Sequence, residues 1–557
     1  MPNSPSQEST KAMANGQWKE ARQLLEQQLQ QYPSAEIFEE LARACWWLND
    51  FTAVFAHRAK AYESFLDKND PHGAARNAGW LGMDYLDFKG EFAIANGWFQ
   101  RAVNLVSDDH DSWELAFVKI IKARLAFMLE KTNENALRFV QESLEISKRV
   151  GSVDGEMMAT GFKGFVFITE GKINEGMALL DEATLIATTA KIKDVNLATI
   201  TCCFLIDACE RIRDFERAGQ WCNKVKEICH RWHFDAMFAS CRTQYASVLI
   251  WKGDWEQAEQ ELLASIKELK QLRPTEIGLS LVRLAELRTK QGKWKETDLL
   301  LAQVESHALK LLASATLAFD KGEWETAADA AERFLRQIPE KENTKKIAVL
   351  ELLLRIYVKQ QRLEEASNIF HQLKEIAEAI DTLPLKAAVL CGSGILSLCS
   401  GDFLKARQNL QDAVDLFDAI KAPLESAHAR IVFAELLIKL QQYRNAESEL
   451  NLALKQLKKM GAEKDMDRCR HLLKSVRKSH TAPEAIKDVC EFTGRELEIL
   501  RLIAEGKNNE EIAEQLFLSV RTVEKHITNL YLKMGVYGKS ARAFAASYAI
   551  KHKLVFN

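Results

Sequence analysis

Three polar residues near the C-terminus, Glu524, Lys525 and Thr528, share one outward face of a predicted helix, at positions i, i+1 and i+4. Glutamate can accept a hydrogen bond from cytosine N4, and lysine can donate one to guanine O6 or N7. Threonine offers a methyl group to thymine and a hydroxyl to a polar base edge. We therefore predict that these three side chains read bases in the major groove. The alternative is that they are only solvated residues of an exposed helix.

Other polar residues near this face are placed to contact phosphates, which position a protein on a duplex without specifying its sequence. They are Ser519, Arg521, Thr522, Lys533 and Lys507. Both sets depend on the elements that hold them.

A cysteine- and histidine-rich segment offers a second kind of chemistry. Cys222, Cys229 and His233 fall at i, i+7 and i+11 along one helical face, and such soft ligands can hold zinc or copper, or the thiols can act as a redox sensor. The stronger interpretation is that the cysteines are small buried apolar residues, since no Cys-x-x-Cys pair occurs. We therefore expect neither a metal nor a cofactor.

The elements that must position the polar face are four short helices with chemical signals at their ends. N-capping residues mark three helix starts and glycines mark two helix ends: Thr493 with Glu496, Asn508 with Glu511, and Ser519 at the starts, and Gly506 and Gly535 at the ends. The third helix is predicted from Val520 to Met534, after a turn of about three residues, and a fourth follows Ser540. This arrangement indicates a helix-turn-helix.

The segment FTGRELEILRLIAEGKNNEEIAEQLFLSVRTVEKHITNLYLKMGV resembles the C-terminal DNA-binding domain of LuxR-type regulators. It follows the family's run from Thr-x-Arg-Glu through Glu-Ile-Ala and Ser-x-x-Thr-Val-x-x-His to Lys-Met-Gly-Val. It departs from the family at Gly494, at Glu524 and at 537–539. The resemblance covers about 65 of the 557 residues. It implies a recognition helix in the major groove and binding to double-stranded DNA.

A repeat governs the chain before this segment. Ten turns recur, each followed by an aromatic or apolar residue and then a small one: GQWKEA at Gly16, GEFAIA at Gly90, GKINEG at Gly171, RDFERA at Arg213, GDWEQA at Gly253, GKWKET at Gly292, GEWETA at Gly322, QRLEEA at Gln361, GDFLKA at Gly401 and QQYRNA at Gln441. Two weaker copies, NDFTAV at Asn49 and KTNENA at Lys131, bring the turns to twelve. Their mean spacing of about 39 residues predicts an all-α solenoid of about twelve helical hairpins over residues 1–478. The pattern resembles tetratricopeptide repeats.

Within each hairpin, we expect the aromatic ring to fill the gap between the two helices and the small residue to let them approach. Trp18, Trp255, Trp294 and Trp324 are predicted to pack at turns in this way. The inner groove of such arrays usually holds peptides or small ligands. Trp80, Asp84 and Asp87 are candidates for that groove in an early repeat.

Composition and charge agree with an ordered globular protein. Hydrophobic residues make up 47% of the chain, charged residues 27%, and prolines number nine. We identify no apolar run of 18 residues and no signal peptide, so we expect no membrane association and a cytoplasmic protein with eleven reduced cysteines. Residues 492–557 carry ten Lys/Arg against seven Asp/Glu, a net charge of +3, which leaves −6 for the remainder. The basic end is therefore the part suited to DNA.

The boundary between the two parts is predicted at a linker over residues 479–490, because Pro483 disfavours helix at Ala482. The DNA-binding domain then occupies residues 491–557. Its net charge of only +3 suggests that useful affinity requires a homodimer.

The motifs of nucleotide-binding loops, serine hydrolases and zinc proteases are all absent from the sequence, so we expect no enzyme. The sequence favours a DNA-binding transcription regulator whose helical array senses a small-molecule, peptide or protein ligand. The alternative is a protein-interaction scaffold with a weak or vestigial DNA-binding domain.

Overall fold

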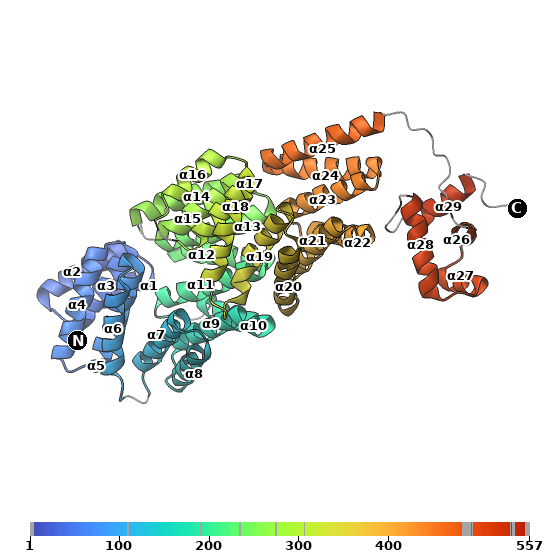
Figure 1. Ribbon diagram of the computed structural model, residues 1–557. Helices are drawn as coiled ribbons and strands as arrows, with labels where there is room; N and C mark the ends of the chain where they lie inside the picture. The colour runs from blue at the N-terminus through green and yellow to red at the C-terminus, as the bar shows by residue number, and fades with distance from the viewer. Residues whose placement is uncertain are drawn as a thin grey trace. The chain divides into compact units, whose positions relative to one another are not determined.

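The computed structural model of the chain describes residues 5–108, 111–189, 192–232, 235–272, 276–305, 307–481, 492, 494–534, 536, 538 and 541–551. All regular structure in these residues is helical, which confirms the predicted all-α class (Figure 1). The chain divides into two units, residues 1–436 with 449–470, and residues 437–448 with 471–557.

The array comprises helices α1 to α25. Its first half contains α1 (Gln7–Ala14), α2 (Trp18–Gln31), α3 (Ala35–Trp47), α4 (Phe51–Asp67), α5 (Pro71–Asp84), the π-helix η1 (Tyr85–Lys89), α6 (Phe92–Leu105), α7 (Trp113–Leu129), α8 (Glu134–Arg149), α9 (Val153–Glu170), α10 (Ile173–Thr189), α11 (Val195–Ile212) and α12 (Phe215–Trp232). Its second half contains α13 (Asp235–Lys252), α14 (Trp255–Leu272), α15 (Ile277–Lys290), α16 (Trp294–Ala302), α17 (Leu309–Lys321), α18 (Trp324–Gln337), the 3-10 helix η3 (Asn343–Lys346), α19 (Ile347–Lys359), α20 (Leu363–Ile380), α21 (Leu383–Ser400), α22 (Phe403–Ala419), α23 (Pro423–Lys439), α24 (Tyr443–Met460) and α25 (Glu463–Thr481).

The helices from α1 to α24 pair in chain order as twelve hairpins, and each predicted turn lies between the two helices of one hairpin. At eleven of the twelve turns the first residue of the motif has a positive φ. Seven of these are glycines, but Asn49, Arg213, Gln361 and Gln441 adopt φ values of 59° to 61° at the same place. The reversed backbone is therefore a property of the repeat, and glycine is only its least strained solution.

The small residue of each motif is the constant feature of the packing. Its side chain is essentially inaccessible in the repeats that match the motif well, as at Ala21, Ala218, Ala258, Ala327, Ala366, Ala406 and Ala446. The aromatic residue is not constant. Trp18 and Trp255 are buried, and Trp255 Nε1 donates to Ile250 O at 3.0 Å, but Trp324 is 39% exposed. The prediction that the ring always fills the inter-helix gap is therefore wrong, because the first residue of the second helix is buried in hairpins 1 and 7 but exposed in hairpin 9.

Contacts between distant hairpins supplement those between neighbours. Arg211 in hairpin 6 pairs with Glu342 at 3.0 Å, just before η3, and Arg213 pairs with Glu351 in α19. A Cβ atom on Gly253 would lie 2.7 Å from Pro423 Cγ, so the turn of hairpin 7 abuts α23. A simple solenoid, in which each hairpin packs only against its neighbours, does not describe this array.

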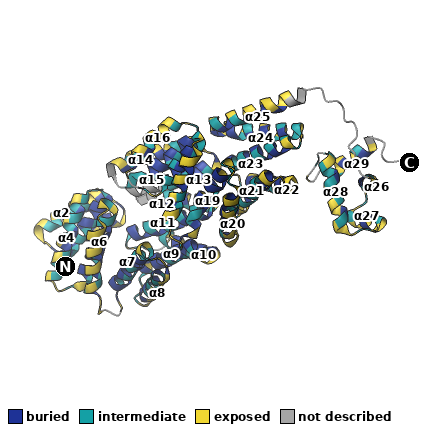
Figure 2. Ribbon diagram, in the orientation of Figure 1, coloured by how far each residue is buried: buried dark blue, intermediate teal, exposed yellow. Residues whose placement is uncertain are grey.

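Helix α21 is long and apolar enough to cross a membrane, with a mean hydropathy of 1.5 over 18 residues. This corrects the expectation that the chain has no such run. In the structure α21 packs against α19, α20 and α22 as one element of the array, so its composition reflects helix packing. Figure 2 shows buried residues concentrated on the faces that the helices turn toward one another.

Helix α25 extends to Thr481, so residues 479–481, predicted as the start of the linker, are helical. Residues 482–491 lie outside the described part of the chain. The helices that follow are α26 (Gly494–Ala504), α27 (Asn509–Leu516), α28 (Val520–Met534) and α29 (Ala541–Lys551). Their bounds agree with the four helices predicted from the sequence.

Candidate nucleic-acid interface

The turn between α27 and α28 consists of residues 517–519, as the sequence predicts. Asn508 and Glu511 form a capping box at the start of α27, with each side chain accepting from the other's backbone N–H. Phe517 ends α27 with a backbone in the left-handed region, at a φ of 55°. The residue is 96% exposed. Ser519 caps α28 by accepting from Thr522 N at 3.1 Å. The two helices are thus fixed at both ends of a three-residue turn.

An apolar core holds α28 against the other three helices. Val523, Ile527 and Leu530 form the buried face of α28, and they meet residues from each of the other helices, among them Ile499 and Leu500, Ile512, and Ala545 and Ala549. Because these buried positions recur every three or four residues, the opposite face of α28 is directed outward.

The three predicted base-reading residues lie on that outward face. Glu524, Lys525 and Thr528 are all exposed, and among the described residues Glu524 and Lys525 form no ion pair. Thr528 Oγ1 donates to Glu524 O at 2.8 Å, so its proton is used within the helix. The methyl group and the oxygen lone pairs of Thr528 remain available. The face can therefore offer one acceptor, one cationic donor and one methyl group.

The five predicted phosphate-contacting residues differ in their exposure and in the partners that they have inside the domain. Arg521 is exposed and forms no ion pair among the described residues, while Lys507 is half-buried. Ser519 and Thr522 share a hydrogen bond of 2.7 Å at the start of α28. Lys533 Nζ lies 2.6 Å from Glu496 Oε2, and the Glu496 side chain is only 4% exposed. Lys533 therefore has a structural partner inside the domain that the sequence did not reveal.

Two arginines that sequence reasoning missed position the reading helix. Arg495 in α26 donates to Leu516 O at 2.7 Å, directly before the turn. Arg542 in α29 donates to Asn509 Oδ1 at 2.9 Å and also to Lys507 O, at the start of α27. Both bind backbone carbonyls or loop groups across 21 to 35 residues, so no local pattern in the sequence marks them.

The family described as bacterial regulatory proteins, luxR family, matches residues 491–546. Residues 491–546 are a LuxR-family DNA-binding domain. The match spans the four helices up to the middle of α29, and the helices, turn and core described above supply the geometry that such a domain requires.

Two relatives illustrate the extent of the similarity. The transcriptional regulatory protein LiaR of Bacillus subtilis (strain 168) is 56% identical over 64 residues, which are 12% of this chain and 29% of LiaR. The oxygen regulatory protein NreC of Staphylococcus aureus (strain JH9) is 52% identical over 61 residues, 11% of this chain and 27% of NreC. The chain thus spans less than a third of each relative, and the array has no counterpart in these alignments.

For the whole chain, a solved structure of the APC/C hetero-tetramer Cut9–Hcn1 matches with a TM-score of 0.44 and 13% sequence identity. The match covers 84% of this chain and 95% of that one. The description of the array therefore depends on its own helices and turns.

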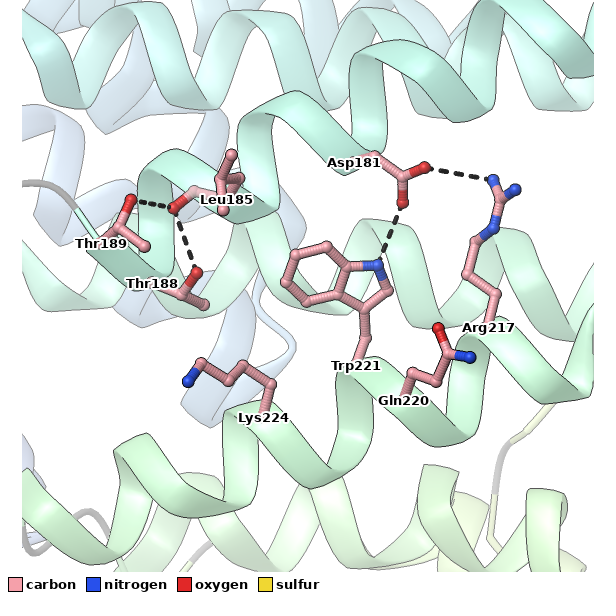
Figure 3. Close-up of a pocket in the computed structure, with 8 residues that line it drawn as sticks. All are labelled: Asp181, Leu185, Thr188, Thr189, Arg217, Gln220, Trp221 and Lys224. Carbon is pink, nitrogen blue, oxygen red and sulfur yellow. Dashed lines mark hydrogen bonds and ion pairs between the residues drawn. The ribbon is translucent and has the colours of Figure 1, made fainter.

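The array contains an open groove of about 540 Å³ between α10 and α12 (Figure 3). Asp181 lies at its centre, where it accepts from Trp221 Nε1 at 3.0 Å and pairs with Arg217 at 3.3 Å. Arg217 also pairs with Asp214. The charged groups at the centre of this groove are thus paired with one another.

The cysteine-rich segment is only partly described. Cys222 is buried, and burial raises the pKa of its thiol to about 12, which keeps it protonated. The Cys229 side chain and His233 lie outside the described residues.

Trp80 and Asp84, candidates for the inner groove, are both buried, and Asp84 pairs with Arg58 at 2.5 Å.

Proposed function

We propose that the protein is a sequence-specific transcription regulator that inserts α28 into the major groove of double-stranded DNA. The observation that carries this proposal is the exposed face of Glu524, Lys525 and Thr528 on a helix whose opposite face is locked into a LuxR-family core. The named relatives are regulatory proteins, and the similarity covers this domain. Base reading belongs to these three residues and phosphate contact to Arg521, Thr522, Ser519 and Lys507, with Lys533 in a supporting role.

Selection from randomised duplexes with the full-length protein tests this proposal. We expect enrichment of one sequence, with two half-sites if the protein binds as a homodimer. The Glu524→Ala, Lys525→Ala double variant keeps the core and should lose the enrichment while retaining salt-sensitive binding to any duplex. The absence of enrichment with the unaltered protein would favour the alternative, an interaction scaffold with a weak DNA-binding domain.

We further propose that the array acts as the sensing part of a cytoplasmic regulator. No nucleotide-binding motif is present in the sequence, so a ligand of the array is the route to control that the chain itself offers. A ligand can shift DNA binding only if it has different affinities for the two arrangements of the protein. The test compares the DNA affinity of the full chain and of fragment 482–557 at one salt concentration, with and without cell extract. An equal response of the two would exclude the array as the sensor.

A further inference from the structure

Phe517, in the turn between α27 and α28, is the most exposed large apolar residue in the described part of the chain. It is 96% exposed, whereas Leu129, the next in order, is 72% exposed. The two neighbours of Phe517 in the chain, Leu516 and Leu518, pack against the core of the domain, but Phe517 is not part of that core. The ring therefore adds no apolar burial to the folded domain.

The backbone at Phe517 adds a second cost. Among the described residues, eight that are not glycine have a positive φ, and seven of these are polar or charged. Phe517, at 55°, is the apolar one. A left-handed backbone suits glycine and asparagine, whereas a bulky side chain is strained there. A residue that is both strained and exposed is expected where it serves an interaction outside the folded chain.

The turn holds this residue at a fixed place beside the start of α28. Leu518 N donates to Ala513 O at 2.9 Å, which closes the end of α27. Arg495 in α26 donates to Leu516 O at 2.7 Å. The backbone on both sides of Phe517 is thus bonded to other elements of the domain.

The start of α28 is the end that enters the major groove in a helix-turn-helix, while the preceding helix crosses the DNA backbone. Phe517 lies between the two helices. It stands two residues before Ser519, whose hydroxyl shares a hydrogen bond of 2.7 Å with that of Thr522, and both are predicted phosphate contacts. This places Phe517 at the rim of the groove, where backbone contacts give way to base contacts. The apolar group that a base edge presents in the major groove is the C5-methyl of thymine.

We propose that the Phe517 ring contacts the C5-methyl group of a thymine at the rim of the major groove. It thereby specifies an A·T pair beyond those read by Glu524, Lys525 and Thr528. This assignment rests on the proposed function, the insertion of α28 into the major groove. Apolar contact with the thymine methyl is one of the ways in which side chains read base edges. Val520, which is 39% exposed, continues the apolar surface onto α28.

The surroundings of the ring favour a base edge over a protein partner. A stable protein interface buries about 800 Å² on each side. The exposed residues near Phe517 in the chain include Gln515, Ser519 and Arg521, which are polar. One ring on a polar surface matches a single methyl group beside phosphates better than it matches an apolar protein surface.

The test begins with the duplex that the full-length protein selects. Each thymine is replaced in turn by deoxyuridine, which removes the C5-methyl group and keeps the base pair. Fluorescence anisotropy at one salt concentration gives the affinity for each duplex. We expect at least one thymine in each half-site at which the replacement weakens binding about fourfold, the loss of one buried methyl group.

Phe517→Asn then assigns the sensitive thymine. Asparagine accepts a positive φ, so the melting temperature of the domain within the full chain should stay the same or rise. At one sensitive thymine the variant should bind the thymine and deoxyuridine duplexes equally. It should keep the discrimination at any thymine that Thr528 reads. The matched control is Phe544→Asn, which changes a 49% exposed residue on α29 and should leave every ratio of thymine to deoxyuridine affinity unchanged.

Three results would overturn the contact: no thymine is sensitive to the loss of its methyl group, Phe517→Asn leaves every ratio unchanged, or Phe517→Asn fails to fold, which would show that the ring supports the domain. Unchanged ratios together with unchanged affinities would indicate a protein partner for the ring instead. Selection that enriches no sequence would overturn the proposed function and this contact with it. An enriched sequence whose binding does not depend on Phe517 would overturn only the contact.

Discussion

The buried arginines between hairpins of the array and the exposed cations on the outward face of α28 serve opposite purposes. In the array, arginines such as Arg211, Arg213 and Arg283 are largely buried and paired with carboxylates of distant hairpins. On α28, Lys525 and Arg521 are exposed and unpaired among the described residues. These arginines of the array therefore hold elements in place, whereas Lys525 and Arg521 are available to a polyanion.

The largest expected effect contrasts the folding of the two regions. Deleting residues 195–232 removes α11 and α12, and α11 contacts α9, α10, α13 and η3. We expect this deletion to abolish cooperative thermal unfolding of the array. Fragment 482–557 should fold alone, because its four helices share one core. Circular dichroism melts of the two proteins measure both outcomes, and a disordered fragment would show that the domain boundary is misplaced.

A single ion pair between distant hairpins should have the next largest effect. Arg213→Ala leaves Glu351 in α19 without its partner at a partly buried site, so the free energy of unfolding should fall by roughly 2–4 kcal/mol. Arg333→Ala is the control. It removes a 3.8 Å pair with Asp329 in which both side chains are more than half exposed, and should cost less than about 0.5 kcal/mol. Similar losses in urea unfolding would mean that contacts between distant hairpins do not stabilise the array.

These two regions were also predictable to different degrees. The turn at Phe517–Ser519, the cap at Asn508 and the twelve hairpin turns follow from local residue preferences, and the structure has them where they were predicted. The pairs Arg213–Glu351 and Arg542–Lys507 join residues far apart in the chain, and no periodicity marks them. Trp324 was predicted to be buried because tryptophan is a large apolar residue, but the burial of its ring depends on the neighbouring hairpin. Local residue preferences predict the helices and turns, whereas the pairing of residues far apart in the chain can be known only from the folded structure.

Base reading should give a smaller effect that depends on sequence. Lys525→Ala removes one exposed donor, so affinity should fall by roughly 1–3 kcal/mol for the selected duplex and much less for duplexes altered at the base pair that it reads. Titration of a set of single-base variants at one salt concentration measures this. Equal weakening for all duplexes would mean that Lys525 contacts phosphate instead.

The smallest expected effect on DNA binding is that of Lys533, because its ammonium is already paired with Glu496 inside the domain. Lys533→Met should change the slope of log affinity against log salt by well under one unit, while lowering the melting temperature of the domain by several degrees, since it removes the 2.6 Å ion pair with the buried carboxylate of Glu496. Arg521→Met should do the reverse. It should flatten the slope by about one unit, because a single phosphate contact is lost, and leave the melting temperature unchanged, because Arg521 has no ion-pair partner among the described residues. If Lys533→Met instead flattens the slope as much as Arg521→Met does, the ion pair with Glu496 opens on DNA. Lys533 would then be a phosphate contact, and its charge would serve both the fold and the DNA.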